Sequence, residues 1–126
     1  MAKEGAHAGL TYEVIGCAQR IHSEVGPGFP ESVYHKAMCL ELVSKKIPFE
    51  TEKKIEVLYQ KTVCGEFRMG LLVNQVLVVE LKALANLNDD HLAQALSYMK
   101  ATNLDVGLLL NFGKKSLQVK RVVSAN

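Results

Sequence analysis

The sequence has little of what marks membrane proteins, secreted proteins or repeat proteins. Its apolar runs all fall short of the roughly 20 residues that a membrane-spanning helix needs, so we expect no membrane partner. The first residues lack the apolar core of a secretory signal, which predicts a cytoplasmic location. Repeats, low-complexity tracts and linker-like stretches are also missing, so the 126 residues indicate a single folding unit.

The sequence also has few cysteines and a small net charge. Cys17, Cys39 and Cys64 lie far apart and no two have the spacing of a metal site, so we expect buried reduced thiols. A net charge of +2 permits binding to nucleic acid without indicating it, because dedicated nucleic-acid-binding domains are usually more basic. What the chain does have is a hydrophobic content of 48%, which is enough for the core of one ordinary domain.

Segments with apolar residues at helical spacing and segments with period-two alternation follow one another along the chain. The predicted order is α-α-β-β-β-α-β-β, which favours a single α/β domain with a mixed β-sheet flanked by helices. We expect residues 1–9 to form a flexible tail and residues 10–126 to form the domain. The predicted helices cover residues 10–25 and 30–46 and begin again at 88, and the predicted strands cover residues 49–59, 63–73, 76–81, 106–110 and 117–123.

The third predicted helix has a clear start and two distinct faces. Asn88 is a strong N-cap residue, and the two aspartates after it suit the positive end of the helix dipole, so we assign them to capping rather than to metal binding. Gln94 and Tyr98 are spaced i and i+4 and share a face with His91. A different, apolar stripe is expected to be buried and consists of Leu92, Ala95, Leu96 and Met99.

The triplet Glu80-Leu81-Lys82 ends a strongly apolar predicted strand. Residues two apart in a strand point to the same face, so Glu80 and Lys82 project together. An unpaired buried charge would be costly there, which leaves two interpretations. Either the two side chains form an ordinary ion pair, or the carboxylate binds a divalent cation while the lysine stabilises developing negative charge.

Another group of residues surrounds the start of the second predicted helix. Gly28, Glu31 and Tyr34 are spaced three apart, and a glutamate at a helix N-terminus also stabilises the helix dipole. Taken alone, Glu31 therefore admits a structural as well as a functional role. The same holds for Gln94 and Tyr98, which as isolated residues would be surface polar groups.

Taken in order, these motifs resemble those of one known family. The set Gly28-x-x-Glu31-x-x-Tyr34, Glu80-x-Lys82, Gln94-x-x-x-Tyr98 and Asn111-Phe112-Gly113 is similar to that of the GxxExxY family of the PD-(D/E)XK nuclease superfamily. The resemblance extends from about residue 10 to residue 123 and implies a PD-(D/E)XK nuclease-like fold.

The resemblance also implies roles for individual residues. Glu80 and Glu31 would bind Mg²⁺ or Mn²⁺, and Lys82 would assist the attack on a phosphodiester bond of DNA or RNA. The accessory residues near the metal or the substrate would be Gln94, Tyr98 and Tyr34.

The chain departs from the family at one central position. Where family members usually carry a metal-binding aspartate, this sequence has Gly70, which offers no side-chain ligand. Glu66 has the same strand parity and is a candidate replacement, although it lies four residues away. Two functions follow: a divalent-metal-dependent phosphodiester hydrolase that is impaired by Gly70, or a catalytically inactive nuclease-fold module that binds nucleic acid or protein.

The connection between the second and third strands decides whether Gly70 and Glu80 can share a site. A two-residue hairpin loop at Asn74 and Gln75 would pair Gly70 with Val79 and place Glu80 on the other face. A shared site requires a three-residue connection or a β-bulge, and we predict one of these between Gly70 and Glu80.

Basic residues near the C-terminus are the best candidates for contacts to phosphate. They are denser than the earlier lysines, which have acidic neighbours, and consist of Lys114, Lys115, Lys120 and Arg121. Exposed strand edges in such a sheet also favour a homodimer.

Overall fold

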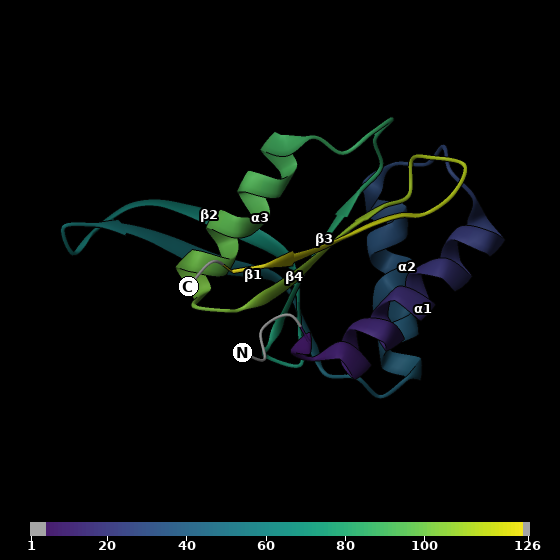
Figure 1. Ribbon diagram of the computed structural model, residues 1–126, viewed down its shortest axis with the longest axis horizontal. Helices are drawn as coiled ribbons and strands as arrows, with labels where there is room; N and C mark the ends of the chain where they lie inside the picture. The colour runs from purple at the N-terminus through teal and green to yellow at the C-terminus, as the bar shows by residue number, and fades with distance from the viewer. Residues whose placement is uncertain (1–4, 125–126) are drawn as a thin grey trace.

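The structure, a computed structural model, describes residues 5–124 and has the predicted α/β architecture (Figure 1). The elements are α1 (Ala8–Val25), α2 (Glu31–Ser44), β1 (Phe49–Tyr59), β2 (Thr62–Val73), β3 (Leu77–Lys82), α3 (Asp89–Thr102), β4 (Val106–Asn111) and β5 (Gln118–Val123). The strands form one sheet in the order β1-β2-β3-β4-β5, in which β3 and β4 run parallel and the other neighbours antiparallel. The predicted mixed sheet and the predicted order of elements are confirmed.

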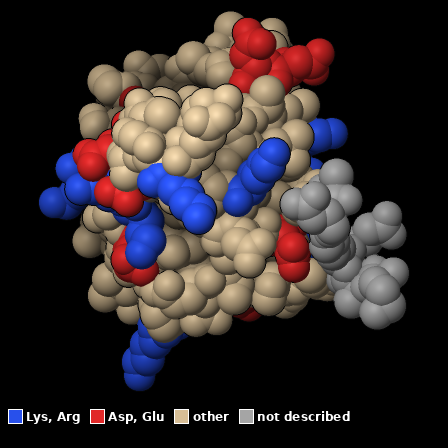
Figure 2. All heavy atoms as spheres, turned by 90° about the vertical axis from the view of Figure 1, so that its left-hand side faces the viewer, with Lys and Arg blue, Asp and Glu red and all other residues tan. Residues whose placement is uncertain are grey.

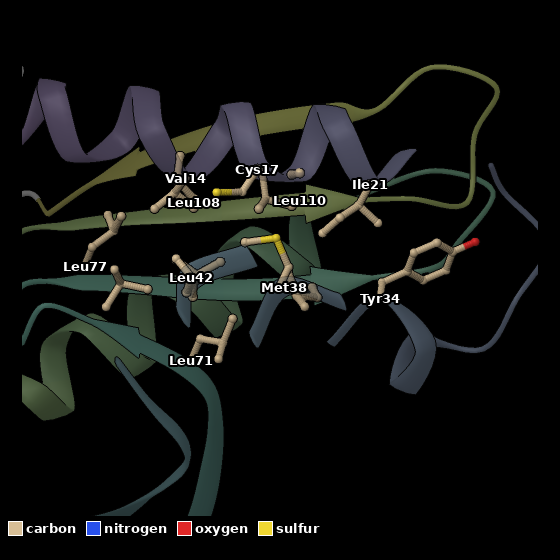
Figure 3. Close-up of a cluster of buried hydrophobic side chains, with 14 of the residues drawn as sticks. Val14, Cys17, Ile21, Tyr34, Met38, Leu42, Leu71, Leu77, Leu108 and Leu110 are labelled. Carbon is tan, nitrogen blue, oxygen red and sulfur yellow. The ribbon is translucent and has the colours of Figure 1, made fainter. Parts of the chain in front are cut away.

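Helices cover both faces of the sheet, with α1 and α2 on one side and α3, the crossover between the parallel strands, on the other (Figure 1). The larger hydrophobic cluster packs beneath α1 and α2 and includes Val14 and Met38 (Figure 3). The smaller cluster packs beneath α3 and includes Met99. Along β3, Val78 enters the smaller cluster and Val79 the larger. A strand that is buried on both faces has a continuous run of apolar residues, as β3 does from Leu77 to Val79.

The turn between α1 and α2 depends on two glycines and a tyrosine. Gly26 and Gly28 have φ angles of 76° and 109°, a region that favours glycine. The Tyr34 hydroxyl donates a hydrogen bond of 2.7 Å to the carbonyl of Gly26 and accepts one from the N–H of Phe29. The Tyr34 ring is fully buried and stacks on Phe112. Tyr34 therefore holds this turn against the core.

The start of α3 is capped as the sequence predicts. The Asn88 side chain accepts hydrogen bonds from the backbone N–H groups of Asp90 and His91. In return, Nδ1 of His91 accepts a hydrogen bond of 3.0 Å from the N–H of Asn88. His91 therefore completes a reciprocal cap, which is a structural role.

The β2–β3 hairpin has the connection that a shared site requires. Val73 pairs with Leu77, so residues 74–76 form the connection and the predicted three-residue length is confirmed. One step beyond the last regular pair of this ladder, Gly70 falls opposite Glu80. Directly opposed residues share a face of the sheet, so these two positions lie on the same side.

The β1–β2 hairpin twists sharply at Glu52 and Gly70. Regular pairing surrounds the two residues, but Glu52 has a φ of 52° and the pair itself is missing from the ladder. In a regular strand, residues two apart point to the same face. Leu71, however, lies in the cluster beneath α1 and α2, whereas Met69 lies in the cluster beneath α3, so the twist reverses the faces of β2. Beyond the twist, the hairpin extends past α3 as a two-stranded ribbon (Figure 1).

Three sequence-based predictions are wrong in detail. Helix α1 already begins at Ala8, so the predicted flexible tail of residues 1–9 is helical at its end, and residues 1–4 lie outside the described part of the chain. Leu96 is 41% exposed rather than buried, because α3 turns the neighbouring stripe toward the sheet. Cys64 is exposed because it lies near the turn of the extended β1–β2 hairpin.

Within residues 5–124, no helix combines the length and the apolar character needed to cross a membrane. The longest helix, α1, buries one stripe of residues against the sheet and is amphipathic.

Replacing Gly113 with alanine should destabilise the fold strongly. A Cβ at this position would overlap the backbone of Ala83 and Leu84, which approach Gly113 directly. Because backbone would have to move, we expect the free energy of unfolding to fall by about 3 kcal/mol or more. Urea denaturation followed by circular dichroism measures this loss.

Gly16→Ala is the matched control for this substitution. Gly16 lies within α1 and nothing stands within 4 Å of its Cβ position. Alanine there should raise the free energy of unfolding by up to about 1 kcal/mol, because glycine is a poor helix former. Equal stability of the two variants would contradict the close approach at Gly113.

Candidate functional site

Glu80 is a buried carboxylate in the centre of the sheet. Its neighbours along β3, Val79 and Leu81, enter the cluster beneath α1 and α2, so Glu80 points to the face that α3 covers. Only 7% of Glu80 is exposed. The Gly70 N–H donates a hydrogen bond of 3.0 Å to Oε2 of Glu80. This contact follows from the three-residue connection, which sets the two positions opposite each other.

Burial raises the pKa of the Glu80 carboxyl, because the protein interior solvates a carboxylate less well than water does. The hydrogen bond from Gly70 and the positive charge of Lys82 lower this pKa, and the negative charges of Glu31 and Glu52 raise it. The net effect is a raised pKa. A carboxyl with a perturbed pKa beside a lysine is typical of catalytic and binding sites.

Lys82 lies on the same face of β3 as Glu80 and reaches toward α3. Its Nζ donates a hydrogen bond of 3.2 Å to Oε1 of Gln94. Tyr98 lies one turn further along α3, where burial raises its pKa and the negative charge of Glu80 raises it further. Among the described residues, no ion pair joins Glu80 to Lys82. The structure therefore brings Glu80, Lys82, Gln94 and Tyr98 together, without the plain ion pair at the strand end.

A buried asparagine fixes the end of β3. The Asn111 side chain accepts hydrogen bonds from the N–H groups of Leu84 and Gly113 and donates one to the carbonyl of Leu84. The N–H of Phe112 donates a hydrogen bond of 2.8 Å to the carbonyl of Lys82. The motif Asn111-Phe112-Gly113 thus holds the backbone that carries Lys82.

Two exposed glutamates lie near enough to affect the charge of Glu80. Glu31 is the first residue of α2, and Glu52 lies at the twist of β1, across from Gly70. Both line a surface hollow of about 540 Å³, whose other lining residues are Ser32, His35, Lys36, Cys39 and Thr51. Glu52 is not among the site residues predicted from the sequence, because its place across from Gly70 follows only from the pairs on either side, Thr51 with Leu71 and Lys53 with Met69.

Two other predicted site residues lie elsewhere. Tyr34 is buried in the cluster beneath α1 and α2, whereas Glu80 faces α3. Glu66 lies on the extended hairpin, where its Oε2 forms an ion pair of 3.2 Å with Nζ of Lys54. Glu66 therefore pairs with a lysine of the hairpin and does not replace the missing aspartate at position 70.

The predicted phosphate-contacting residues do not form one surface. Lys120 and Arg121 are neighbours on β5 and point to opposite faces of the sheet. Arg121 donates a hydrogen bond of 2.7 Å to the carbonyl of Ala6, before α1, whereas Lys120 lines a hollow at the start of α3. Lys114 and Lys115 lie in the connection between β4 and β5.

The donor set is incomplete for a metal ion. Within residues 5–124, no group of three or more histidine, cysteine, aspartate or glutamate side chains stands close enough to hold one. Glu80 supplies one buried carboxylate, and its neighbour across the hairpin, Gly70, has no side chain. The residues present therefore do not form a complete divalent-metal site. What is missing is a second carboxylate directly beside Glu80.

Replacing Glu80 with glutamine should stabilise the protein at neutral pH. Because the folded-state pKa of Glu80 is raised, the wild type loses stability as the pH rises from about 4, the ordinary glutamate range, through this raised pKa. Glutamine is uncharged throughout and can still accept the hydrogen bond from Gly70. The variant's advantage in the free energy of unfolding should be larger at about pH 8 than at about pH 4 when measured by urea denaturation.

The exposed Glu24 of α1, replaced with glutamine, is the control. The Glu24 side chain is in water, so its replacement should not reproduce the gain in the free energy of unfolding that Glu80→Gln shows at about pH 8. A Glu80→Gln advantage that does not grow with pH would show that burial of the charge does not oppose folding.

Comparison with known proteins gives one family and one fold. A family model described as the PD-(D/E)XK nuclease superfamily matches residues 8–122. The crystal structure of a protein called SSO0001 is similar, with a TM-score of 0.58 at 15% sequence identity over 89% of this chain. This chain spans 65% of the length of SSO0001, and at such low identity the likeness concerns the fold alone. No curated protein matches the chain. Because the family model covers most of the sequence, this protein belongs to the PD-(D/E)XK nuclease superfamily.

Proposed function

We propose that this protein is a phosphodiester hydrolase of the nuclease type, acting on DNA or RNA, whose activity is limited by Gly70. The observation that carries the proposal is the convergence of Glu80, Lys82 and Gln94 on the face beneath α3. Within the superfamily, we assign the chain to the GxxExxY family, on the motif formed by Gly28, Glu31 and Tyr34 and the motifs that follow it.

The side chains present suit the proposed chemistry only in part. The Lys82 ammonium, held by Gln94, would stabilise the negative charge that develops on a phosphate during hydrolysis. Members of the superfamily typically use divalent metal ions, which supply positive charge at the phosphate and an activated water. In the proposal the ion is Mg²⁺ or Mn²⁺ and its ligands are Glu80 and Glu31. The incomplete donor set would hold such an ion weakly, which is the reason for the limited activity.

Position 70 has room for the missing carboxylate. A Cβ there would lie 3.4 Å from the carbonyl oxygen of Val79 and 3.7 Å from Oε2 of Glu80, which are ordinary contact distances. An aspartate at this position would place its carboxylate next to that of Glu80. Two neighbouring carboxylates together with waters and a phosphate are a common set of ligands for Mg²⁺.

The alternative is a nuclease-fold module that binds nucleic acid or protein without cleaving it. The incomplete donor set favours this alternative, because loss of one carboxylate removes a catalytic group without disturbing the fold. The buried Glu80 beside Lys82 favours the hydrolase, because a purely structural strand would be more stable with an apolar residue at this position.

Gly70→Asp should raise metal-dependent cleavage by about 100-fold or more, because it completes the pair of carboxylates. The assay uses labelled single- and double-stranded DNA and RNA with Mg²⁺ or Mn²⁺. Gly70→Asn is the matched control, since asparagine has the same shape without the charge, and it should cleave no faster than wild type. Glu80→Gln added to Gly70→Asp should abolish the gain.

Calorimetry with Mn²⁺ in the absence of substrate gives a second measurement. Gly70→Asp should bind Mn²⁺ more tightly than Gly70→Asn, because only the aspartate adds negative charge beside Glu80. If all folded variants fail to cleave every substrate, the hydrolase proposal is wrong and the binding module takes its place. If all variants cleave equally, position 70 has no part in the activity.

A further inference from the structure

The outer strand of the sheet presents an unusually long and partly apolar edge. Strand β1 has 11 residues and lies at the end of the strand order. An edge strand offers unpaired backbone N–H and C=O groups to another strand. Toward its end β1 also exposes large apolar side chains, with Val57, Leu58 and Tyr59 exposed by 39%, 61% and 67%. Figure 2 views the molecule from the hairpin end, where uncharged surface is bordered by interleaved basic and acidic side chains.

The charges on the extended hairpin are arranged in two rows of like sign. Glu56 on β1 stands directly opposite Glu66 on β2, and Lys54 stands directly opposite Arg68. Like charges in directly opposed positions of a sheet destabilise it. The ion pair between Lys54 and Glu66 joins the two rows diagonally, but both of its side chains remain 51% exposed. At the free edge, the acidic row ends with Glu56 and the basic row ends with Lys54, and a strand of opposite charge beside β1 would neutralise both.

We propose that β1 pairs antiparallel with β1 of a second copy of this chain, about a two-fold axis through Ile55. In this register Ile55 faces its own copy, Lys54 faces Glu56 of the second copy, and Glu56 faces Lys54 of the second copy. The acidic row of each copy then continues into the basic row of the other. The two five-stranded sheets become one sheet of ten strands.

The charge pattern selects this register over its neighbours. In a two-fold antiparallel pair, opposed residues share a face, so the axis passes through one residue and its copy. Moving the axis by one residue toward the N-terminus sets Lys54 against Lys54 of the second copy. Moving it by one residue toward the C-terminus sets Glu56 against Glu56. Of these three registers, the one centred on Ile55 is the one that brings opposite charges together on both sides of the axis.

The apolar end of β1 gains cover in the same register. Val57 lies beside Lys53 of the second copy, whose aliphatic stem can pack on it. The irregularity of the β1–β2 ladder lies between Val57 and Leu58, beyond the four charged positions of the proposed contact. Lysines and bulges on an edge strand can also prevent pairing with another strand. In that case the wild-type chain would stay monomeric.

Sedimentation velocity of the full chain at low salt should show a dimer whose population rises with concentration and falls with added salt. Glu56→Lys should weaken self-association by about tenfold or more, because it sets lysine against lysine across the axis. Its own fold should be retained, since the new lysine then faces Glu66 within the hairpin. Lys54→Glu should behave in the same way, with the new glutamate facing Arg68.

The decisive sample is an equal mixture of the two variants. Glu56→Lys carries only positive charges at positions 54 and 56, and Lys54→Glu carries only negative ones. The mixture should therefore form a heterodimer at concentrations at which each variant alone is mostly monomeric. Lys61→Glu in the hairpin turn is the control and should leave the dimer intact. A wild-type monomer at every concentration, or a dimer that neither variant nor mixture alters, would overturn the proposal.

Discussion

The candidate site depends on the number of residues between β2 and β3. Because Val78 and Val79 are both buried, the apolar pattern of β3 fits either face and does not fix its register. The three-residue connection fixes it instead, and with it the direction in which Glu80 points. The hydrogen bond from Gly70 to that carboxylate is a direct result. Everything that gathers around Glu80, from Lys82 to the polar face of α3, follows from this one choice.

Burial of a carboxylate among apolar strands opposes folding, and the chain offsets this cost only in part. One backbone N–H and one neighbouring lysine stabilise the charge of Glu80, whereas Glu31 and Glu52 act against it. In the proposed function, Glu80, Glu31 and Lys82 would also take part in a reaction at a phosphate. Proteins commonly keep such unfavourable charges where they bind or react, so the buried charge of Glu80 makes this face of the sheet a candidate site.

Much of the fold follows from the sequence because its signals are local. Periodicity located the helices and strands, and the Asn88 cap marked α3. Strand parity showed that Gly70 and Glu80 can share a face only with a three-residue connection or a β-bulge, and the structure has the three-residue connection. The rest depends on long-range geometry. Glu52 enters the site only because the hairpin register sets it across from Gly70, and Leu96 is exposed because of the way α3 rests on the sheet. No spacing within a single element carries that information.

The surroundings of Gly70 also determine how far the chain stands from one with a second carboxylate beside Glu80. The Cβ position of Gly70 has neighbours only at ordinary contact distances, its φ is not in the left-handed region, and its N–H donates a hydrogen bond to Oε2 of Glu80. A side chain at position 70 therefore needs no change in the conformation of the backbone. Glycine and aspartate are neighbours in the genetic code, so one nucleotide change separates the two residues. A single point mutation would thus add a carboxylate beside Glu80 without rebuilding the fold.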